Sequence, residues 1–401
     1  MSGALAGLRV VELGEMVSAP YAAKLMADLG AEVIKVERPT IGDPARRRGP
    51  FPGDRPHLDK SGLFLYLNSN KLGVTLDPSC PAGFKILEQL AANADVLIHD
   101  LPPAEMDRIG LDFDRIAAIN PRLVMTSVEP FGLSGPCRDW RSSELTLWAS
   151  GGAIYINGSA AEPEMPPLKA YGYQAGYQGG AHAAVATMGA LFAGVRGAGG
   201  QHVEVSIQES VASITELAFQ CWPYLGLIAT RFGQRPVQPL ESFECRDGWI
   251  FVCCVEEHQW RNFVKIMDSP DWTDESIFVD GPSRAANWDA LRLLLKEWIA
   301  NQSVDDLYRK AQARRVPFAP VSHLGDLLDS PHLKARGFFV EIAHPIAGEL
   351  RYPGAPYHLE RTPWAIRRPA PTLGQHNDEI YSGRLGLSAM EIDRLRDEAV
   401  I

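Results

Sequence analysis

Cysteine is scarce in this sequence: there are six among 401 residues, and no two of them form a CxxC pair. The sequence also lacks an HExxH segment, a Walker-type loop and a GxSxG elbow. These absences argue against a zinc site, a P-loop nucleotide site and serine-hydrolase chemistry. We therefore expect no metal, and we expect the cysteines to be reduced core thiols in a cytoplasmic protein.

Long apolar runs and an excess of positive charge are missing as well. No apolar stretch reaches the roughly 18 residues of a membrane span, and the N-terminus has no charged-then-apolar signal pattern. A formal net charge of −10 argues against a general nucleic-acid binder. The 46% hydrophobic and 22% charged residues are typical of a globular protein, and 401 residues favour two domains.

The first organised stretch, residues 8–38, predicts a strand, a helix and a second strand. LRVVEL and EVIKVER are short β-branched runs, and the helical segment between them begins near Pro20 and ends at Gly30. Two strands this close, joined by a helix, form a parallel βαβ unit. Glu37 ends the second strand as in dinucleotide-binding units, but the first turn, GEMVSAP, has no GxGxxG. The sequence therefore does not favour an NAD or FAD site.

The alternation of helices and strands continues to about residue 130. Apolar runs near 73–76, 96–98 and 122–130 predict further strands, so we expect an open, doubly wound α/β sheet. Residues 181–195 are small and almost uncharged, which predicts a helix that is buried all round. We interpret His182, within this helix, as a core residue rather than a catalyst.

The pattern changes after about residue 225. A hairpin around 246–248 and amphipathic helices beyond it predict a smaller α+β domain. A final helix is expected after Ser388, with Glu391 three residues on as in a capping box. We expect a large domain over residues 1–224, a small domain over 225–328, and a linker and C-terminal segment over 329–401 that returns to the large domain.

Residues 39–60 form a Pro-, Gly- and Arg-rich loop after a strand. Long loops inside compact domains are usually functional, and ligands of open α/β sheets bind at the carboxyl ends of strands. Arg46, Arg47 and Arg48 therefore either face an anionic ligand or form a solvated surface run. The residues alone indicate a cytoplasmic two-domain α/β protein with a small-molecule site.

Several segments together resemble the family III CoA-transferases of the CaiB/BaiF type. They are LAGLRVVEL, SAPYAAKLMADLGAEVIKVERPTIGD, NSNKLGVTLD, GAGGQHVEVSIQES, SPHLKARGFF and LGQHNDEIYSGRLGLS. The resemblance covers nearly the whole chain, and in character it is closest to the non-catalytic subunit of benzylsuccinate-type CoA-transferases. It implies a large Rossmann-like domain, a small domain, two chains interlocked as a dimer, and a CoA thioester and an organic acid as substrates.

The resemblance also implies which residues contact coenzyme A. The first loop holds Met16 together with two of these residues, Val17 and Ser18. Arg38 suits a contact with phosphate or adenine. Asp100 stands where the family often has Asn. Each position could equally be ordinary surface. The implied set is Val17, Ser18, Arg38, Asn70, Lys71, Asp100, Leu101, Arg108 and Arg141.

The nucleophile of the family is missing. It is an aspartate whose carboxylate attacks the acyl-CoA and then carries CoA as a thioester. Aligned on GAGGQ, that position falls on Gly176, and no Asp occurs in residues 140–246. Glu144 fits an acidic position in the site wall and is the possible catalytic carboxylate, whereas Glu162 and Glu164 lie in a loop among prolines.

Related racemases move an α-proton with a His and an Asp, but those positions are Ser143 and Gly176 here, so an isomerase is the least favoured reading. Two readings remain. In the first, the chain is the non-catalytic subunit of a CoA-transferase, interlocked with a paralogue that bears the aspartate. In the second, it is a homodimeric CoA-binding protein or an acyl-CoA enzyme with different chemistry. The residues to test in that case are Tyr171, Tyr173, Tyr177 and His182.

Overall fold

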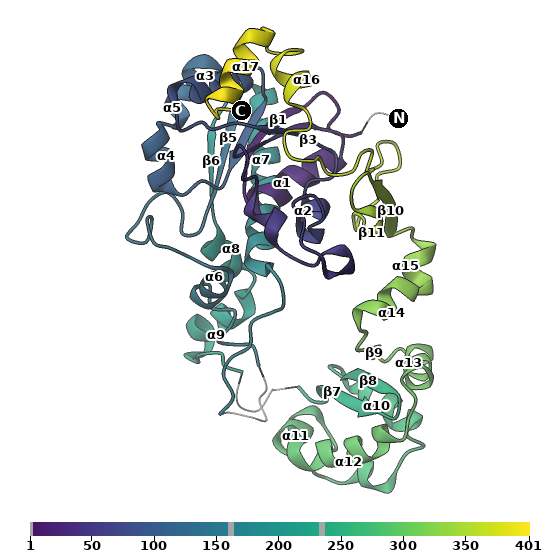
Figure 1. Cartoon of the computed structure of the whole chain (residues 1–401). Coiled ribbons are helices and arrows are strands. Elements are labelled where there is room, and N and C mark those ends of the chain that lie inside the picture. The colour runs from purple at the N-terminus through teal and green to yellow at the C-terminus, as the bar shows by residue number, and fades with distance from the viewer. Residues whose placement is uncertain (1–2, 159–163, 232–236) are drawn as a thin grey trace. The chain divides into compact units, whose positions relative to one another are not determined.

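The computed structural model describes residues 3–158, 164–231 and 237–401, drawn as the coloured ribbon in Figure 1. These residues form two compact units. The first comprises 3–158, 164–231 and 338–401, and the second comprises 237–337. The expected boundary at residue 224 lies within helix α9, Glu216–Leu225, and the one at 328 lies within helix α14, Leu324–Asp329.

A six-stranded sheet with the strand order β3-β2-β1-β4-β5-β6 organises the first unit. Every neighbouring pair of strands in it is parallel, which confirms the open α/β sheet expected from the sequence. The strand order reverses beside β1, and such a position, at the carboxyl ends of the strands, is where open parallel sheets bind ligands. The strands are β1 Arg9–Leu13, β2 Glu32–Glu37, β3 Lys71–Thr75, β4 Val96–His99, β5 Val124–Glu129 and β6 His202–Ser206.

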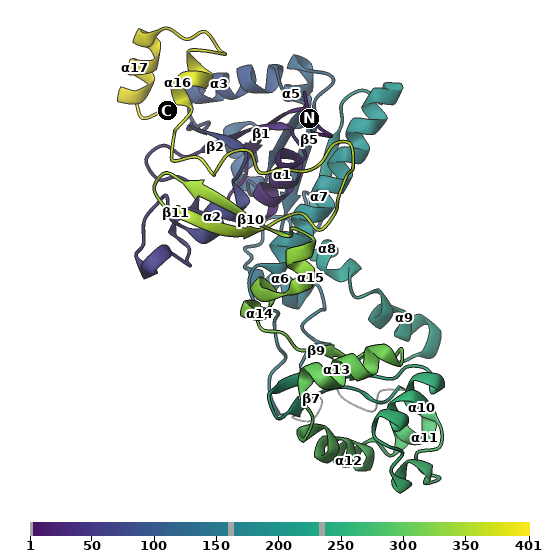
Figure 2. The ribbon, with the colours of Figure 1, turned by 90° about the vertical axis from the view of Figure 1, so that its right-hand side faces the viewer.

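Helices cover both faces of this sheet, among them α1 Ser18–Asp28, α3 Pro81–Ala92, α5 Phe113–Ile119 and α7 Gln174–Ala193 (Figures 1 and 2). Val11 and Leu97 enter the core that contains residues of α3 and α5. Their neighbours Val10 and Ile98 enter the core that contains residues of α1 and α7. Successive side chains of a strand point to opposite faces, so a strand buried on both faces, such as β4, is apolar without alternation.

Small residues let α1 and α7 approach closely. A Cβ atom built on Gly180 of α7 would lie 2.5 Å from the backbone oxygen of Ser18, so only glycine fits there. Ala19 and Ala22 of α1 and Ala183 of α7 lie in the same buried cluster. The close contact places the N-terminus of α7 beside the loop that follows β1.

Helix α7 is not buried all round, contrary to the expectation from its composition. Val185 is 74% exposed and Phe192 is 62% exposed. His182 is also exposed, and its Nδ1 lies 2.9 Å from the backbone oxygen of Gln178, so the interpretation as a core histidine is wrong. An uncharged helix composition indicates an apolar surface but does not say whether this chain itself covers it.

The loop after β2 is built around Arg46, which is fully buried. Its guanidinium lies 2.7 Å from Glu37 Oε2, 2.8 Å from Asp59 Oδ1 and 3.6 Å from the centre of the Phe64 ring. The hypothesis of an anion-facing loop is therefore wrong for Arg46, because its charge is neutralised inside the protein. The same guanidinium binds both carboxylate oxygens of Glu37, which further disfavours a ribose-binding role for that residue.

The C-terminal part of the chain covers the outer edge of β3. The amide of His376 donates to the Gly73 carbonyl, and the amide of Gly73 donates to His376 Nδ1. Farther along the strand, the Tyr381 hydroxyl donates to the Thr75 carbonyl at 2.6 Å. An uncovered edge strand is a template for pairing with other chains, so this segment protects the sheet.

The other elements of the first unit pack around this sheet. Ser388 and Glu391 form the capping box that the sequence predicts at the start of the last helix. The hairpin of β10 and β11 lies beside α2 in Figure 2, and Tyr352 of the hairpin and Phe64 of α2 belong to one buried cluster. The remaining elements are η1 Pro44–Arg47, η2 Pro52–Asp54, α2 Gly62–Leu67, α4 Pro103–Ile109, α6 Glu144–Ser150, η3 Gly194–Ala198, α8 Ile207–Ser213, β10 Phe339–His344, β11 Gly348–Pro353, α16 Asn377–Tyr381 and α17 Ala389–Asp397.

The second unit is a small antiparallel sheet covered by helices. The hairpin expected around 246–248 is confirmed, since β7 and β8 pair antiparallel. The elements are β7 Leu240–Cys245, β8 Gly248–Cys253, α10 Glu257–Ile266, η4 Asp271–Asp274, α11 Gly281–Ala286, α12 Trp288–Ala300, α13 Val304–Ala313, β9 Ala319–Pro320, α14 and α15 Pro331–Ala335. Across both units as described, no helix is long and apolar enough to cross a membrane.

Candidate functional site

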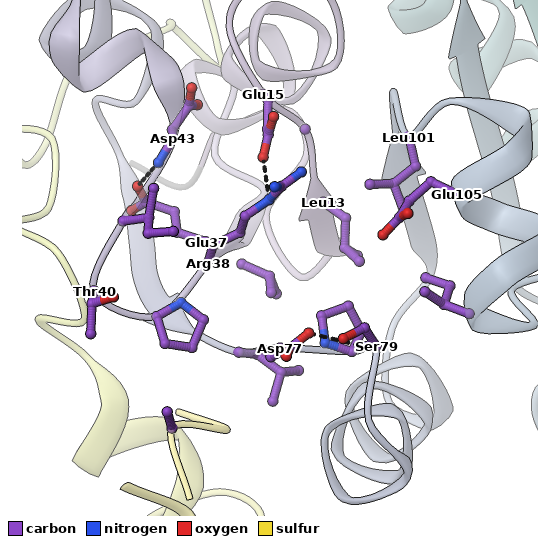
Figure 3. Close-up of a pocket in the computed structure, with 18 of the residues that line it drawn as sticks. Leu13, Glu15, Glu37, Arg38, Thr40, Asp43, Asp77, Ser79, Leu101 and Glu105 are labelled. Atoms are coloured by element: carbon purple, nitrogen blue, oxygen red, sulfur yellow. Dashed lines mark hydrogen bonds and ion pairs between the residues drawn. The ribbon is translucent and has the colours of Figure 1, made fainter.

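A cavity of about 340 Å³ lies at the carboxyl ends of β1, β2 and β4, as Figure 3 shows. The loops that follow neighbouring parallel strands meet at one edge of a sheet, which is why distant segments of the chain line one cavity. Of the predicted CoA contacts, Arg38, Leu101 and Arg108 lie together here. The wall includes Leu13, Gly14, Glu15, Glu37, Arg38, Thr40, Asp43, Asp77, Ser79, Leu101, Glu105 and Arg108.

Two arginines bring positive charge to this cavity, and each has a carboxylate beside it. Arg38 Nε lies 2.9 Å from Glu15 Oε1, and Arg108 pairs with Glu105 in the same helix. Burial raises the pKa of Glu15, while the Arg38 charge opposes the shift. Both arginine side chains are more than half exposed, so the ion pairs are weak and an entering anion can compete for them. The wall also carries the carboxylates of Glu15, Glu37, Asp43, Asp77 and Glu105, so a phosphate-bearing ligand would have to bind through Arg38 and Arg108.

Asp100, at the end of β4, fastens the loop that leads from β1 into α1. Its Oδ1 accepts the Glu15 amide at 2.8 Å, and its Oδ2 accepts the Ser18 hydroxyl at 2.8 Å and the Ala19 amide at 3.3 Å. Burial raises the pKa of Asp100 to about 7, although these hydrogen bonds act in the opposite direction. Ser18 and Asp100, both predicted CoA contacts, are thus parts of one hydrogen-bonded loop beside the cavity.

Gly176 lies where that loop meets the first turn of α7. A Cβ atom built on Gly176 would lie 3.1 Å from Val17 Cβ, so Val17 packs directly on this glycine. The carboxylate of Glu144, the first residue of α6, accepts the Ala175 amide at 2.8 Å and the Gly176 amide at 3.2 Å. Lys169 Nζ lies 3.8 Å from the same carboxylate. The structure therefore brings Val17, Gly176 and Glu144 together, and places an acidic group at the positive end of a helix.

Asn70 and Lys71 lie outside the cavity wall. Asn70 has a positive φ of 67°, and its Oδ1 accepts the Arg367 amide at 2.6 Å. Lys71 is fully buried with its Nζ 2.6 Å from Glu12 Oε2, and burial lowers the pKa of Lys71 to about 8. Both residues fasten β3 to its surroundings, and their contact with CoA stays a prediction.

The tyrosines considered for a different chemistry lie in solvent or in ordinary packing. Tyr171 is 95% exposed. Tyr177 packs edge to face against Tyr21 with ring centres 4.8 Å apart, and burial raises the pKa of Tyr177 to about 12. A phenol with that pKa stays protonated at neutral pH, which makes it a poor base. Arg141 is exposed ahead of α6, and its contact with CoA stays a prediction.

Sequence reasoning missed the carboxylates that face the predicted arginines. Glu105 stands three residues before Arg108, and this helical spacing could have predicted the ion pair. Glu15 gave no such signal, because its contact depends on the fold of a loop. Of the other carboxylates near the missing nucleophile, Glu164 is exposed and Glu162 lies outside the described residues.

Comparisons with known proteins point to a single family. The model of CoA-transferase family III matches residues 5–377. The succinyl-CoA:(R)-benzylsuccinate CoA-transferase subunit BbsE of Thauera aromatica is 34% identical over 399 residues, covering 96% of this chain and 95% of that protein. The formyl-CoA:oxalate CoA-transferase of Streptomyces avermitilis is 31% identical over 420 residues, covering 100% of both chains. The crystal structure of a CAIB/BAIF family protein from Brucella suis is similar with a TM-score of 0.85 and 25% identity, covering 96% of this chain and 100% of that one. The chain therefore belongs to CoA-transferase family III.

Proposed function

We propose that the chain takes part in the transfer of CoA between an acyl-CoA and a carboxylic acid, as a subunit that lacks the family's aspartate nucleophile. The observation that carries this proposal is Gly176, which has no side chain at the start of α7, where the sequence resemblance puts the aspartate. The transfer needs an enzyme carboxylate that can hold CoA as a thioester. The relative BbsE is itself named as a subunit, which supports a complex of two different chains.

In this proposal CoA binds across the cavity at the carboxyl ends of the strands. Arg38 and Arg108 meet its phosphates, because guanidinium groups form charge-assisted hydrogen bonds with phosphate oxygens. Leu101 contributes apolar wall, and the loop that holds Val17 and Ser18 runs from Glu15 in the cavity wall to Gly176. The residues present thus fit CoA as the substrate.

A partner chain covers an exposed apolar surface in this proposal. Helix α9 has no buried residue, and its Leu217, Phe219 and Trp222 are 76%, 59% and 62% exposed. Contiguous large apolar side chains on a surface mark a protein interface. We propose that a paralogue bearing the aspartate interlocks with this chain and covers α9.

Native mass spectrometry of the protein purified from its own cells, at natural expression levels, tests the assembly. We expect a heteromer whose second chain carries the aspartate, and we expect the complex to exchange a labelled acid into acyl-CoA. A pure homodimer that binds CoA without exchanging acids would contradict the proposal, and would favour the reading as a CoA-binding protein. Trp222→Glu should prevent the two chains from assembling, whereas Glu216→Gln on the same helix should not.

A further inference from the structure

The Glu144 carboxylate lies against the backbone of Gly176, the position that aligns with the missing aspartate. Its Oε1 accepts the Ala175 amide at 2.8 Å, and its Oε2 accepts the Gly176 amide at 3.2 Å. We propose that Glu144 is the acceptor carboxylate of this chain, which takes CoA from an acyl-CoA and holds it as a thioester. The inference rests on the proposed function, since it names the reacting group within the same CoA-transfer site.

The position of Glu144 is fixed by the start of α6. The Ser143 amide donates to Thr146 Oγ1 at 2.7 Å, and the Thr146 amide donates to Ser143 Oγ at 3.3 Å. A helix capped in this way has an ordered first turn, so the backbone of Glu144 is held. Glutamate is one methylene longer than aspartate, and from the neighbouring helix α6 the Glu144 carboxylate reaches the backbone amides of α7.

Gly176 places no side chain against the Glu144 carboxylate, and Lys169 lies beside that carboxylate. The atoms nearest to a Cβ atom built on Gly176 are two carbons of Val17, at 3.1 and 3.2 Å, and the Ser18 amide nitrogen at 3.9 Å. The Glu144 side chain is mostly buried, with 15% of it exposed. The Lys169 ammonium lies 3.8 Å from this carboxylate.

The reaction balances without a further reactant. A Glu144 oxygen attacks the carbonyl carbon of the acyl-CoA, the C–S bond breaks, and a glutamyl anhydride and CoA thiolate form. The thiolate attacks the Glu144 carbonyl carbon, which releases the first acid as its carboxylate and leaves a glutamyl-CoA thioester. The second acid then reverses both steps and leaves with CoA, which regenerates Glu144. The Ala175 and Gly176 amides are placed to donate to the oxyanion that forms at each attack on Glu144.

Peptide mapping of the wild-type protein, in the assembly in which it is purified, tests this inference. The assembly is incubated with acetyl-CoA, succinyl-CoA or benzoyl-CoA, treated with borohydride to reduce any enzyme-bound thioester to an alcohol, and digested for mass spectrometry. We expect the reduced residue in this chain to be Glu144. Glu144→Gln should lower the yield of that modification more than about tenfold, because the amide is a poor nucleophile. The matched control Glu164→Gln, at an exposed carboxylate 20 positions along the chain from Glu144, should leave it unchanged.

The outcomes separate this inference from the proposed function. Exchange of labelled acid in the assembly, with an aspartate of the partner modified and Glu144 unmodified, overturns the inference and leaves the proposed function standing. Absence of both exchange and modification with all three donors overturns both. If Glu144→Gln does not fold, the wild-type map alone decides, because it locates the modified residue without a variant.

Discussion

The Ser18 hydroxyl donates a hydrogen bond of 2.8 Å to the Asp100 carboxylate. This bond joins the end of β4 to the loop after β1, and the same carboxylate also holds the Glu15 amide. On one side the loop reaches Arg38 through Glu15, and on the other side Val17 packs on Gly176. The wall of the cavity and the first turn of α7 are therefore held by one short segment.

Asp100 should make the stability of the fold depend on pH. Its pKa is raised from 3.8 to about 7 in the folded protein, so between these values the folded state binds more protons than the unfolded state. The contribution of this group to stability is therefore complete below about pH 4 and is lost as the pH rises through 7. Compared with Asp100→Asn, the wild type should lose about 1–2 kcal/mol more of its free energy of unfolding between pH 4 and 7. Urea unfolding at several pH values measures the difference, and parallel curves for the two proteins would refute it.

Gly176→Asp should be destabilising for as long as Glu144 is present. A second carboxylate would then lie in the first turn of α7, where Glu144 already accepts two amides, and neighbouring like charges repel. We expect a loss of about 1–2 kcal/mol in the free energy of unfolding relative to Gly176→Ala, which adds only the Cβ atom beside Val17. Adding Glu144→Gln should restore the stability and leave one carboxylate, able to form a CoA thioester at position 176. Equal unfolding midpoints for the alanine and aspartate variants would contradict the repulsion.

Arg38→Gln and Arg108→Gln should each weaken CoA binding about tenfold. Each variant removes a charge-assisted hydrogen bond to phosphate, which contributes about 1–3 kcal/mol. Isothermal titration calorimetry measures the effect, and pantetheine, which has no phosphate, should bind all variants alike. Arg115→Gln is the control, because Arg115 pairs with Glu88 and does not line the cavity. Unchanged CoA affinity in the first two variants would place the nucleotide elsewhere.

Arg46→Met should cost about 3–5 kcal/mol of stability, because it leaves the Glu37 carboxylate buried without its partner. Arg47→Met, at the neighbouring position, should change stability by less than about 0.5 kcal/mol. Adding Glu37→Gln to Arg46→Met should recover part of the loss, since no buried charge then remains unpaired at that position. Chemical denaturation measures all three, and similar midpoints for Arg46→Met and Arg47→Met would show that the buried ion pair does not support the fold.

The sheet could be predicted from the sequence because short runs of β-branched and apolar residues alternate with helical segments. Runs such as Val96–Ile98 admit few alternatives once helical segments separate them, and the capping box at Ser388 fixes the start of the last helix. The loop after β2 could not be predicted, because three adjacent arginines look alike until the fold buries Arg46. Composition also could not show that Val185 faces outward, since an apolar helix surface is compatible with a core or with a partner.

The candidate site could be predicted where it depends on strand ends and could not where it depends on helix packing. Arg38 and Leu101 follow two strands of one parallel sheet, and such strand ends meet at one edge. The contact of Glu144 with Gly176 joins residues 32 positions apart on two helices. It depends on how α6 lies against the start of α7, which no sequence pattern specifies.

The C-terminal segment that pairs with the outer edge of β3 has a consequence for how the protein is synthesised. Gly73 can pair with His376 only after the ribosome has added the 303 residues that follow Gly73 up to that histidine. The whole of the second unit is synthesised in between, so the nascent chain carries an open sheet edge for most of its translation. Such edges pair readily with other unfinished chains. A ribosome that stops shortly before the C-terminal segment therefore releases an aggregation-prone protein rather than a slightly shortened but folded one.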